Sequence, residues 1–289
     1  MLNDCNILLS IVIPTYNRCN YLRELLPEIL NQCDQIDPES IEIELVLCDN
    51  ASTDTTQEYI AAQKKGKRIS YYRNSENIGG DANFINGVKL AKGNFVWLFG
   101  DDELLVENAI SNVIRILKES SCSLLIVRHD LYSVGLQHSH LFNNYKELVH
   151  SISKINPHFI LAHTLITANI FKREVFDINY AFHCISTNYG HMYALMNNLK
   201  VGGTVFFSNE PIIIVRKHRA EFDKPPEFLE FKQIRYIQYI GKTFNDRNIV
   251  IFSYKFGLKL FIHYIYNKFR QIKSIFKPEI QSQNLKDER

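Results

Sequence analysis

The chain has 289 residues, 46% of them hydrophobic and 22% charged, and a formal net charge of +2. A chain of this size can bury a large hydrophobic core in one domain, or in one domain with a smaller appendage. The composition excludes disordered, collagen-like and coiled-coil proteins. The near-zero net charge excludes a strongly basic nucleic-acid-binding protein.

The cysteines and the N-terminal residues both predict a cytoplasmic protein. The six cysteines are scattered, with no C-x-x-C pair and no histidine at metal-ligand spacing. We therefore expect buried thiols in a reducing compartment rather than a zinc site. The first apolar run follows Asp4 and ends at Pro14, which differs from a secretory signal peptide. No uncharged apolar run approaches the ~20 residues needed to span a bilayer.

Short apolar runs alternate with segments of helical apolar spacing up to residue 130. This alternation predicts an α/β fold with a Rossmann-like, mostly parallel sheet that is flanked by helices on both faces. Pro27 is expected to kink or end the first helix, while Asp54 and Asp81 are expected to cap the second and third helices. The predicted strands are Ile7–Ile13, Ile43–Cys48, Ile69–Tyr72, Asn94–Phe99 and Ser123–Val127. The predicted helices are Tyr21–Gln32, Glu58–Lys64, Asp81–Ala91 and Glu107–Lys118.

The alternation is lost after His129. Farther along the chain, Thr204–Phe207 and Ile212–Val215 are predicted to be two strands that are joined by a turn at Asn209–Pro211. The last third of the chain has helical spacing.

Polar and acidic residues follow four of the predicted strands. In open α/β sheets, ligands bind outside the carboxyl ends of the strands. A single loop of this kind also fits ordinary turn and capping chemistry, but four at successive strand ends indicate a binding site. The four segments are Pro14–Arg18, Asp49–Asp54, Arg73–Asn83 and Gly100–Glu103.

These segments differ from a dinucleotide-binding site. The chain has neither G-x-G-x-x-G after the first strand nor a G-x-x-x-x-G-K-[ST] motif. Instead, Asp101, Asp102 and Glu103 directly follow a buried strand. Carboxylate oxygens suit Mg²⁺ or Mn²⁺, which bridge to substrate phosphates. The alternative is a solvated acidic turn or the N-terminal cap of the next helix.

Four segments together resemble the family 2 glycosyltransferases of the GT-A fold: I-V-I-P-T-Y-N-R, L-C-D-N-A-S-T-D, N-I-G-G-D-A-N-F and A-K-G-N-F-V-W-L-F-G-D-D-E-L-L. The match covers roughly residues 7–130. The resemblance implies transfer of a sugar from a nucleotide-activated donor to an acceptor hydroxyl, with inversion and usually with Mg²⁺ or Mn²⁺. Within the family, the sequence is similar to the bacterial sugar transferases of O antigen and other surface polysaccharides, including dideoxyhexosyl (abequosyl) transferases.

The resemblance also implies roles for single residues in donor binding. Asp49 would bond the nucleotide base, and Asn83 lies in the helix whose start faces the donor. The nucleotide pocket would be lined by Pro14, Thr15, Tyr16, Asn17 and Arg18.

The implied metal site departs from the family pattern at one position. Asp101 matches the metal-binding acid of the family's D-x-D element, but Phe99 stands where that element has its first Asp. Metal ligation is therefore expected from Asp101 with Asp102 or Glu103.

An inverting displacement needs a general base near the acceptor hydroxyl. The family places an acidic residue at the start of a later helix, and the corresponding stretch here, Asn188–Leu195, contains no Asp or Glu. His191 is the titratable residue in that stretch with an ordinary pKa near the working pH. We predict His191 as the base, with Asp102 as the second candidate. The alternative is a structural histidine at the edge of the core.

Two further segments are assigned to the active site. Leu165–Arg173 resembles the family's segment leading into the acceptor pocket. The alternative is a strand followed by a basic turn. Arg216 and His218 would stabilise the charge that the diphosphate leaving group gains. The alternative for both is a solvated basic loop.

Residues 249–278 combine six Lys or Arg with eight Phe or Tyr and contain no Asp or Glu. This pattern fits an interfacial helix on the anionic surface of the cytoplasmic membrane, which would suit an acceptor built on a lipid carrier. The alternatives are a core helix with a basic outer face and a nucleic-acid-binding segment. Since nothing else in the chain supports the last, we expect no nucleic-acid partner.

We therefore expect three parts: a nucleotide-sugar-binding half (1–130), an acceptor-binding half of the same GT-A domain (131–220) and a helical, basic-aromatic C-terminal extension (221–289). Two alternatives come from other classes. A sugar-nucleotide pyrophosphorylase would need a glycine- and arginine-rich loop after the first strand, which is missing. A degenerate, non-catalytic binding module is opposed by the retained Asp49 and Asp101.

Overall fold

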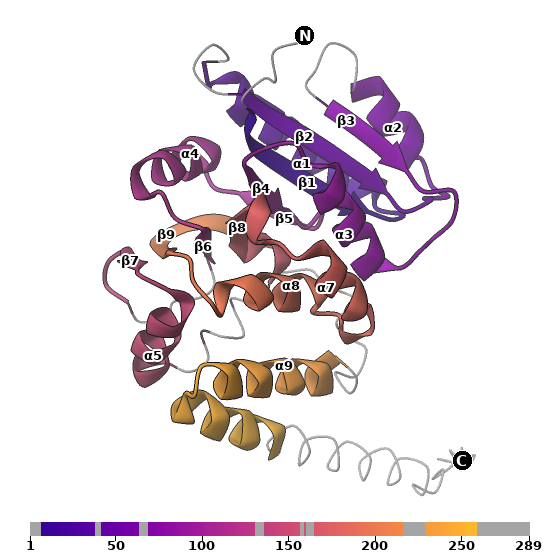
Figure 1. Cartoon of the computed structure of the whole chain (residues 1–289). Helices are drawn as coiled ribbons and strands as arrows, with labels where there is room; N and C mark the ends of the chain where they lie inside the picture. Colours follow the sequence, from indigo (N-terminus) through magenta and orange to yellow (C-terminus); the bar gives the residue numbers. More distant parts are fainter. Residues whose placement is uncertain are drawn as a thin grey trace, which may run out of the picture.

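The computed structural model describes residues 7–37, 42–63, 69–130, 136–156, 159, 165–216 and 229–258. These residues form one nine-stranded sheet with the strand order β3-β2-β1-β4-β8-β6-β9-β5, and β7 pairs with β9 (Figure 1). The predicted α/β fold is confirmed. The strands are β1 (Ile7–Thr15), β2 (Glu42–Asp49), β3 (Ile69–Arg73), β4 (Phe95–Leu98), β5 (Glu103–Leu105), β6 (Leu124–His129), β7 (His140–Phe142), β8 (Asn169–Lys172) and β9 (Val205–Val215).

The sheet is parallel where the first part of the chain forms it. β1 lies between β2 and β4, and β2 also pairs with β3, all in parallel. Beyond β4 the sheet is mixed, because β8 runs antiparallel between β4 and β6. β9 is parallel to β6 and antiparallel to β5 and β7. The described part of the second half of the chain therefore completes the same sheet.

Each face of the sheet is covered by its own hydrophobic core. On β1, Leu9, Ile11 and Ile13 pack with α1, α2 and α4, whereas Val12 packs with α3, α5 and α8. Side chains alternate between the two faces of a strand, so burial of both faces requires the nearly continuous apolar run seen in the sequence. The helices are α1 (Cys19–Asp34), α2 (Thr56–Gln63), α3 (Gly80–Leu90), α4 (Ala109–Ser120), α5 (Tyr145–Ile155), α7 (Ile178–His183), α8 (Gly190–Leu199) and α9 (Leu229–Thr243), with short 3₁₀ helices η1 (Ile166–Ala168), η2 (Arg173–Val175) and η3 (Ile185–Thr187).

Pro27 was expected either to kink or to end the first helix, and it does not end it. α1 continues through Pro27 to Asp34. Pro27 is exposed, while Leu26 and Ile29 on the other side of α1 are fully buried. The hydrogen bond lost at proline therefore falls on the solvent side, and the packing of the buried side holds the helix together.

The two predicted helix caps have different outcomes. Asp54 accepts a hydrogen bond from the backbone N–H of Thr56, the first residue of α2, at 3.0 Å. Asp81 is not the cap of α3, because the cap position is Gly79, which has a φ of +86°. Asp81 instead accepts a hydrogen bond from the backbone N–H of Asn188 at 3.1 Å. It thus ties the start of α3 to the loop before α8.

The predicted strand pair at residues 204–215 is wrong. β9 is one strand, and the irregularity around Asn209 and Pro211 is a bulge in its pairing with β6. Arg128 of β6 donates a hydrogen bond to the Asn209 carbonyl at 2.7 Å across this bulge. Because β6 pairs with residues on both sides of the bulge, the chain stays extended instead of reversing.

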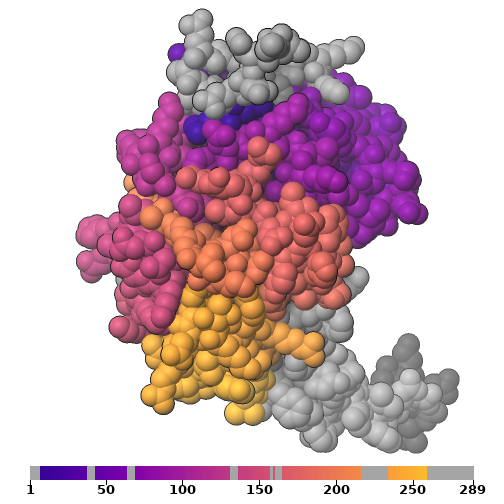
Figure 2. Space-filling model, in the orientation of Figure 1, coloured from indigo at the N-terminus to yellow at the C-terminus, as the bar shows by residue number. Residues whose placement is uncertain are grey.

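α9 packs beneath α8, and a further helix over residues 247–258 lies beneath α9 (Figures 1 and 2). Tyr236 of α9 stacks on Tyr189 with ring centroids 5.6 Å apart and meets Tyr193 of α8 edge-on at 5.3 Å. Ile249 and Phe252 lie in the same core. One side of this helix therefore contributes to the core, whereas Ile251, Tyr254 and Leu258 are exposed. The rest of the basic-aromatic stretch lies outside the described residues. Among the helices that the structure describes, none is both long and apolar enough to cross a bilayer.

Candidate functional site

A pocket of about 350 Å³ opens at the carboxyl ends of β1, β2 and β4. The end of β1, the loops after β2 and β4, the first turn of α3 and η1 supply its walls. The polar strand ends identified in the sequence therefore converge at one place. The predicted site residues among its lining are Pro14, Thr15, Tyr16, Arg18, Asn83, Asp101 and Asp102.

Asp101 lies in the wall of this pocket and is held by Thr15, the last residue of β1, and by Arg18, the residue before α1. Thr15 Oγ1 donates a hydrogen bond to Asp101 Oδ2 at 2.8 Å, and Arg18 Nη1 donates to Asp101 Oδ1 at 2.8 Å. Arg18 Nη1 also lies 3.3 Å from Asp102 Oδ2. Burial raises the pKa of Asp101 to about 6, although Arg18 and Thr15 act in the opposite direction.

The positions of the Asp101 and Asp102 carboxylates fit a divalent cation. Both carboxylates converge on one cationic atom, Arg18 Nη1, so a metal ion at that point would meet an oxygen from each. Magnesium sites commonly use one or two carboxylates and take their remaining ligands from water and substrate phosphates. Glu103 begins β5, is buried, and is not part of the pocket lining. Within the described ranges, no three His, Cys, Asp or Glu side chains are grouped closely enough to hold a metal.

Phe99 occupies a position at which a charged side chain would be buried. It is fully inaccessible and meets Trp97 edge-on, with ring centroids 5.2 Å apart. Phe95, Trp97 and Phe99 alternate along β4 into the core formed with α1 and α4. Position 99 thus continues the apolar face of β4 instead of reaching the pocket.

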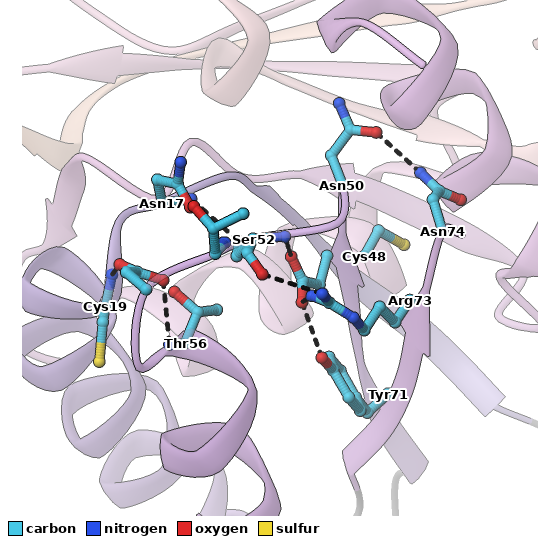
Figure 3. Close-up of polar contacts among 12 residues, drawn as sticks. Asn17, Cys19, Cys48, Asn50, Ser52, Thr56, Tyr71, Arg73 and Asn74 are labelled. Atoms are coloured by element: carbon cyan, nitrogen blue, oxygen red, sulfur yellow. Dashed lines mark hydrogen bonds and ion pairs between the residues drawn. The ribbon is translucent and has the colours of Figure 1, made fainter. Parts of the chain in front are cut away.

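Asp49 is fully buried behind the pocket and does not line it. Its carboxylate accepts hydrogen bonds from the Ser52 backbone N–H at 2.8 Å and from the Tyr71 hydroxyl at 2.7 Å, and it pairs with Arg73 (Figure 3). Burial alone would raise the pKa of Asp49, but the hydrogen bonds from Ser52, Tyr71 and Arg73 lower it below the usual 3.8. Asp49 therefore holds β3 and the loop after β2 together, and its neighbour Asn50 reaches the pocket.

Asn17 joins the loops after β1 and β2. Its backbone N–H donates to Ser52 Oγ at 2.9 Å, and its side-chain oxygen accepts from the Thr53 backbone N–H at 2.7 Å (Figure 3). Its φ of +54° lies in the left-handed region, which asparagine tolerates better than most residues. The structure therefore places Asn17 beside the pocket, as part of the frame that fixes these two loops.

A network of asparagine amides that the sequence analysis missed fixes the start of α3. Asn74 Nδ2 donates to Asn50 Oδ1 at 2.9 Å and to Asn83 Oδ1 at 3.0 Å. Asn83 Nδ2 donates to the Cys48 carbonyl at 2.8 Å. Asn50 and Asn83 both line the pocket. These three asparagines are evident in the sequence, but their pairing depends on the parallel contact of β2 with β3.

The two candidate bases lie at different depths. Asp102 lines the pocket and its side chain is 24% exposed. His191, the second residue of α8, is only 6% exposed. Its ring lies edge-on to Phe84, with centroids 6.5 Å apart, and Phe84 lines the pocket. Ile166 of η1, in the segment expected to lead to the acceptor, also lines the pocket.

Of the two cationic residues that were predicted to face the leaving group, the described part of the chain contains Arg216. Arg216 follows β9, pairs with Glu24 of α1, and lies over the ring of Tyr21 at 5.2 Å from its centroid. It is absent from the pocket lining. His218 lies outside the described residues.

Comparisons of the sequence with known proteins identify glycosyltransferases as its relatives. The family model "Glycosyl transferase family 2" matches residues 10–178. Abequosyltransferase RfbV of Salmonella typhimurium is 32% identical over 237 residues, which cover 75% of this chain and 69% of that protein. The GalNAc(5)-diNAcBac-PP-undecaprenol beta-1,3-glucosyltransferase of Campylobacter jejuni is 35% identical over 108 residues, or 37% of this chain and 33% of its own length.

Solved structures share the fold at low sequence identity. S. aureus TarS 1–349 in complex with UDP-GlcNAc matches with a TM-score of 0.58 at 14% identity, covering 80% of this chain and 67% of that one. Mannosyltransferase PcManGT from Pyrobaculum calidifontis, in complex with GDP-Man and Mn²⁺, matches with a TM-score of 0.53 at 14% identity, covering 82% and 63%. These matches confirm the GT-A fold that the sequence resemblance implied.

The buried pair of Asp49 and Arg73 predicts a pH-dependent stability. A carboxyl group with a lower pKa in the folded state stabilises the fold fully above its unfolded pKa, and this contribution is lost as the pH falls through the folded value. Asp49→Asn should therefore lower the urea midpoint at pH 7, and the difference from the unsubstituted protein should shrink below pH 3.8. Asp34→Asn, at an exposed position at the end of α1, is the matched control. An equal loss for Asp49→Asn at both pH values would contradict this assignment.

Proposed function

This chain belongs to the family 2 glycosyltransferases, and from that membership we propose that it moves a sugar from a nucleotide-activated donor to a glycan hydroxyl, inverting the anomeric centre. The main support is the pocket in which Asp101, Asp102 and Arg18 meet at the strand ends. Membership in a transferase family also disfavours the pyrophosphorylase and the non-catalytic module.

The donor would lie along the strand ends with its diphosphate near Asp101. Thr15 and Arg18 hold the Asp101 side chain in place, and Asn50 and Asn83 present amides to the same pocket. Asp101 and Asp102 would hold a divalent cation, Mg²⁺ or Mn²⁺, which supplies positive charge to the leaving diphosphate when it is bound. The named complexes of TarS with UDP-GlcNAc and of PcManGT with GDP-Man and Mn²⁺ support this arrangement.

We assign the general base to His191, with Asp102 as the alternative. An in-line displacement needs the base on the side of the sugar opposite to the leaving group. If Asp101 and Asp102 attend the diphosphate, neither is well placed to take the acceptor proton. His191 lies behind Phe84 on the α3 and α8 side of the pocket, which is separate from the carboxylates in the loop after β4.

The acceptor is proposed to be a growing bacterial surface polysaccharide, such as O antigen, on a lipid carrier. The name of the Campylobacter relative specifies an undecaprenol-linked acceptor, and the Salmonella relative is named for the transfer of abequose. Both names support a glycan acceptor for this chain, and the second supports a deoxyhexosyl donor.

We also propose that the protein binds the inner face of the cytoplasmic membrane through the helix at 247–258. Three apolar side chains of this helix, Ile251, Tyr254 and Leu258, are 51%, 61% and 60% exposed. Their spacing of three and four residues places them on one side of the helix, next to exposed Lys255. Apolar side chains flanked by lysine suit the headgroup region of an anionic bilayer.

The metal and donor assignment predicts a selective loss in Asp101→Asn. The substitution removes the charge of the carboxylate at nearly constant volume, so turnover and Mn²⁺-dependent donor binding should be lost while the fold remains. A thermal-shift screen of UDP-, GDP-, TDP- and CDP-sugars with Mn²⁺ identifies the donor, and turnover is then measured with it. Glu119→Gln, on the exposed side of α4, is the control. Unchanged turnover in Asp101→Asn would show that the assignment is wrong.

The base assignment predicts that His191→Ala lowers kcat by ~10²–10⁴-fold, which is the usual contribution of a general base. Donor affinity should change little, because His191 does not line the donor pocket. Asp102→Asn should instead weaken donor binding in the presence of Mn²⁺. The measurements are steady-state kinetics and donor titrations on both variants. Normal kcat in His191→Ala would transfer the role to Asp102 or to another group.

The membrane assignment predicts co-sedimentation with anionic vesicles at low salt, which weakens as salt rises because ions screen the charges. Replacing Ile251, Tyr254 and Leu258 with serine should reduce the pelleted fraction without changing the urea midpoint, since all three side chains are exposed. Val201→Ser, at a position that is 84% exposed, is the control and should pellet normally. Failure of the unsubstituted protein to pellet at low salt would contradict the proposal.

A further inference from the structure

Arg18 holds the position that a cation between Asp101 and Asp102 would take. Its Nη1 atom is 2.8 Å from Asp101 Oδ1 and 3.3 Å from Asp102 Oδ2. The guanidinium thus contacts both carboxylates with a single nitrogen. A positively charged arginine and a divalent cation would repel each other strongly at this separation, so they cannot hold the same two oxygens together.

The surroundings of Arg18 allow its side chain to move while its backbone stays fixed. The Arg18 carbonyl accepts hydrogen bonds from the backbone N–H groups of Tyr21 and Leu22, at 3.0 and 3.1 Å, in the first turn of α1. The side chain is 29% exposed and lines the pocket. Its guanidinium also lies 5.6 Å from the centroid of the Tyr21 ring, a cation–π contact that it makes while it contacts the carboxylates.

Other charges near Arg18 keep it from leaving the site altogether. Arg216 lies over the same Tyr21 ring at 5.2 Å and is paired with Glu24. The repulsion of Arg216 disfavours a movement of Arg18 outward along α1. An anionic group inside the pocket would therefore be the favourable new partner for the Arg18 guanidinium, and arginine binds phosphate oxygens in a bidentate manner.

We propose that Arg18 competes with a divalent cation for Asp101 and Asp102, and that it turns to the donor diphosphate when the cation is bound. The inference rests on the proposed donor site. It makes cation and nucleotide binding cooperative: the cation frees Arg18 for the diphosphate, and the diphosphate draws Arg18 away from the carboxylates. By linkage, each ligand must increase the affinity of the other by the same factor.

The decisive measurement is Mn²⁺ affinity in the absence of nucleotide, followed by the loss of the free-ion electron paramagnetic resonance signal. Arg18→Gln removes the competing charge, so Mn²⁺ should bind at least about tenfold more tightly than to the unsubstituted protein. An arginine that only stabilises the loop predicts unchanged or weaker Mn²⁺ binding, and that result would overturn the proposal. Arg115→Gln, which breaks an exposed pair with Glu119 on α4, is the matched control.

Two further variants test whether the effect arises from charge and from this site. Arg18→Lys retains the positive charge, so its Mn²⁺ affinity should stay close to that of the unsubstituted protein. A gain equal to that of Arg18→Gln would contradict competition by charge. Arg18→Met, which also removes the charge, replaces Arg18→Gln if the latter does not fold. Adding Asp101→Asn to Arg18→Gln should abolish the gain, and a gain that persists would place the cation elsewhere and overturn the proposal.

To test the role of Arg18 toward the diphosphate, the Mn²⁺ titration is repeated with saturating UDP, GDP, TDP or CDP. The best of these should tighten Mn²⁺ binding to the unsubstituted protein and should do so much less in Arg18→Gln. Equal tightening in both would contradict the role of Arg18 toward the diphosphate. Absence of sugar transfer with any donor, together with the Mn²⁺ gain in Arg18→Gln, would reject the proposed function and leave the competition intact.

Discussion

The parallel pairing of β1 with β2 on one side and β4 on the other determines where the whole site lies. Thr15, the last residue of β1, is in register with Asp49, the last residue of β2. Val12 is in register with Leu98, so Asp101 emerges beside the end of β1, within reach of Thr15. Because three carboxyl ends meet at one edge, short polar loops are enough to build a pocket there.

A carboxylate at the end of a buried strand loses contact with water, which has an electrostatic cost. The protein compensates this cost to different extents for Asp49 and Asp101. Asp49 receives hydrogen bonds on both oxygens and a paired arginine, which lower its pKa and make it a structural anchor. Asp101 is also buried and paired, yet its pKa is raised to about 6. The charge of Asp101 is thus less completely compensated by the protein, which leaves it suited to an added cation.

Most of the fold up to residue 130 could be predicted, because short apolar runs alternate there with segments of helical apolar spacing. The pocket could be predicted because its loops directly follow the predicted strands. The insertion of β8 between β4 and β6, the short strand β5 and the continuity of β9 could not, since they depend on pairing between residues far apart in sequence. The same limit applies to Arg216, whose partner Glu24 lies on the first helix.

The pocket and α8 are joined by contacts between residues that are far apart in the sequence. Asp81 of α3 binds the backbone before α8, and Phe84, one turn farther along α3, meets His191. α3 in turn is positioned by Asn83, whose amide reaches the end of β2. A shift of the loops after β2 and β3 would therefore be passed through α3 to the helix that contains His191. This linkage explains how the described residues after His129, which have little sequence pattern, are still placed accurately. They pack directly on the most regular part of the fold.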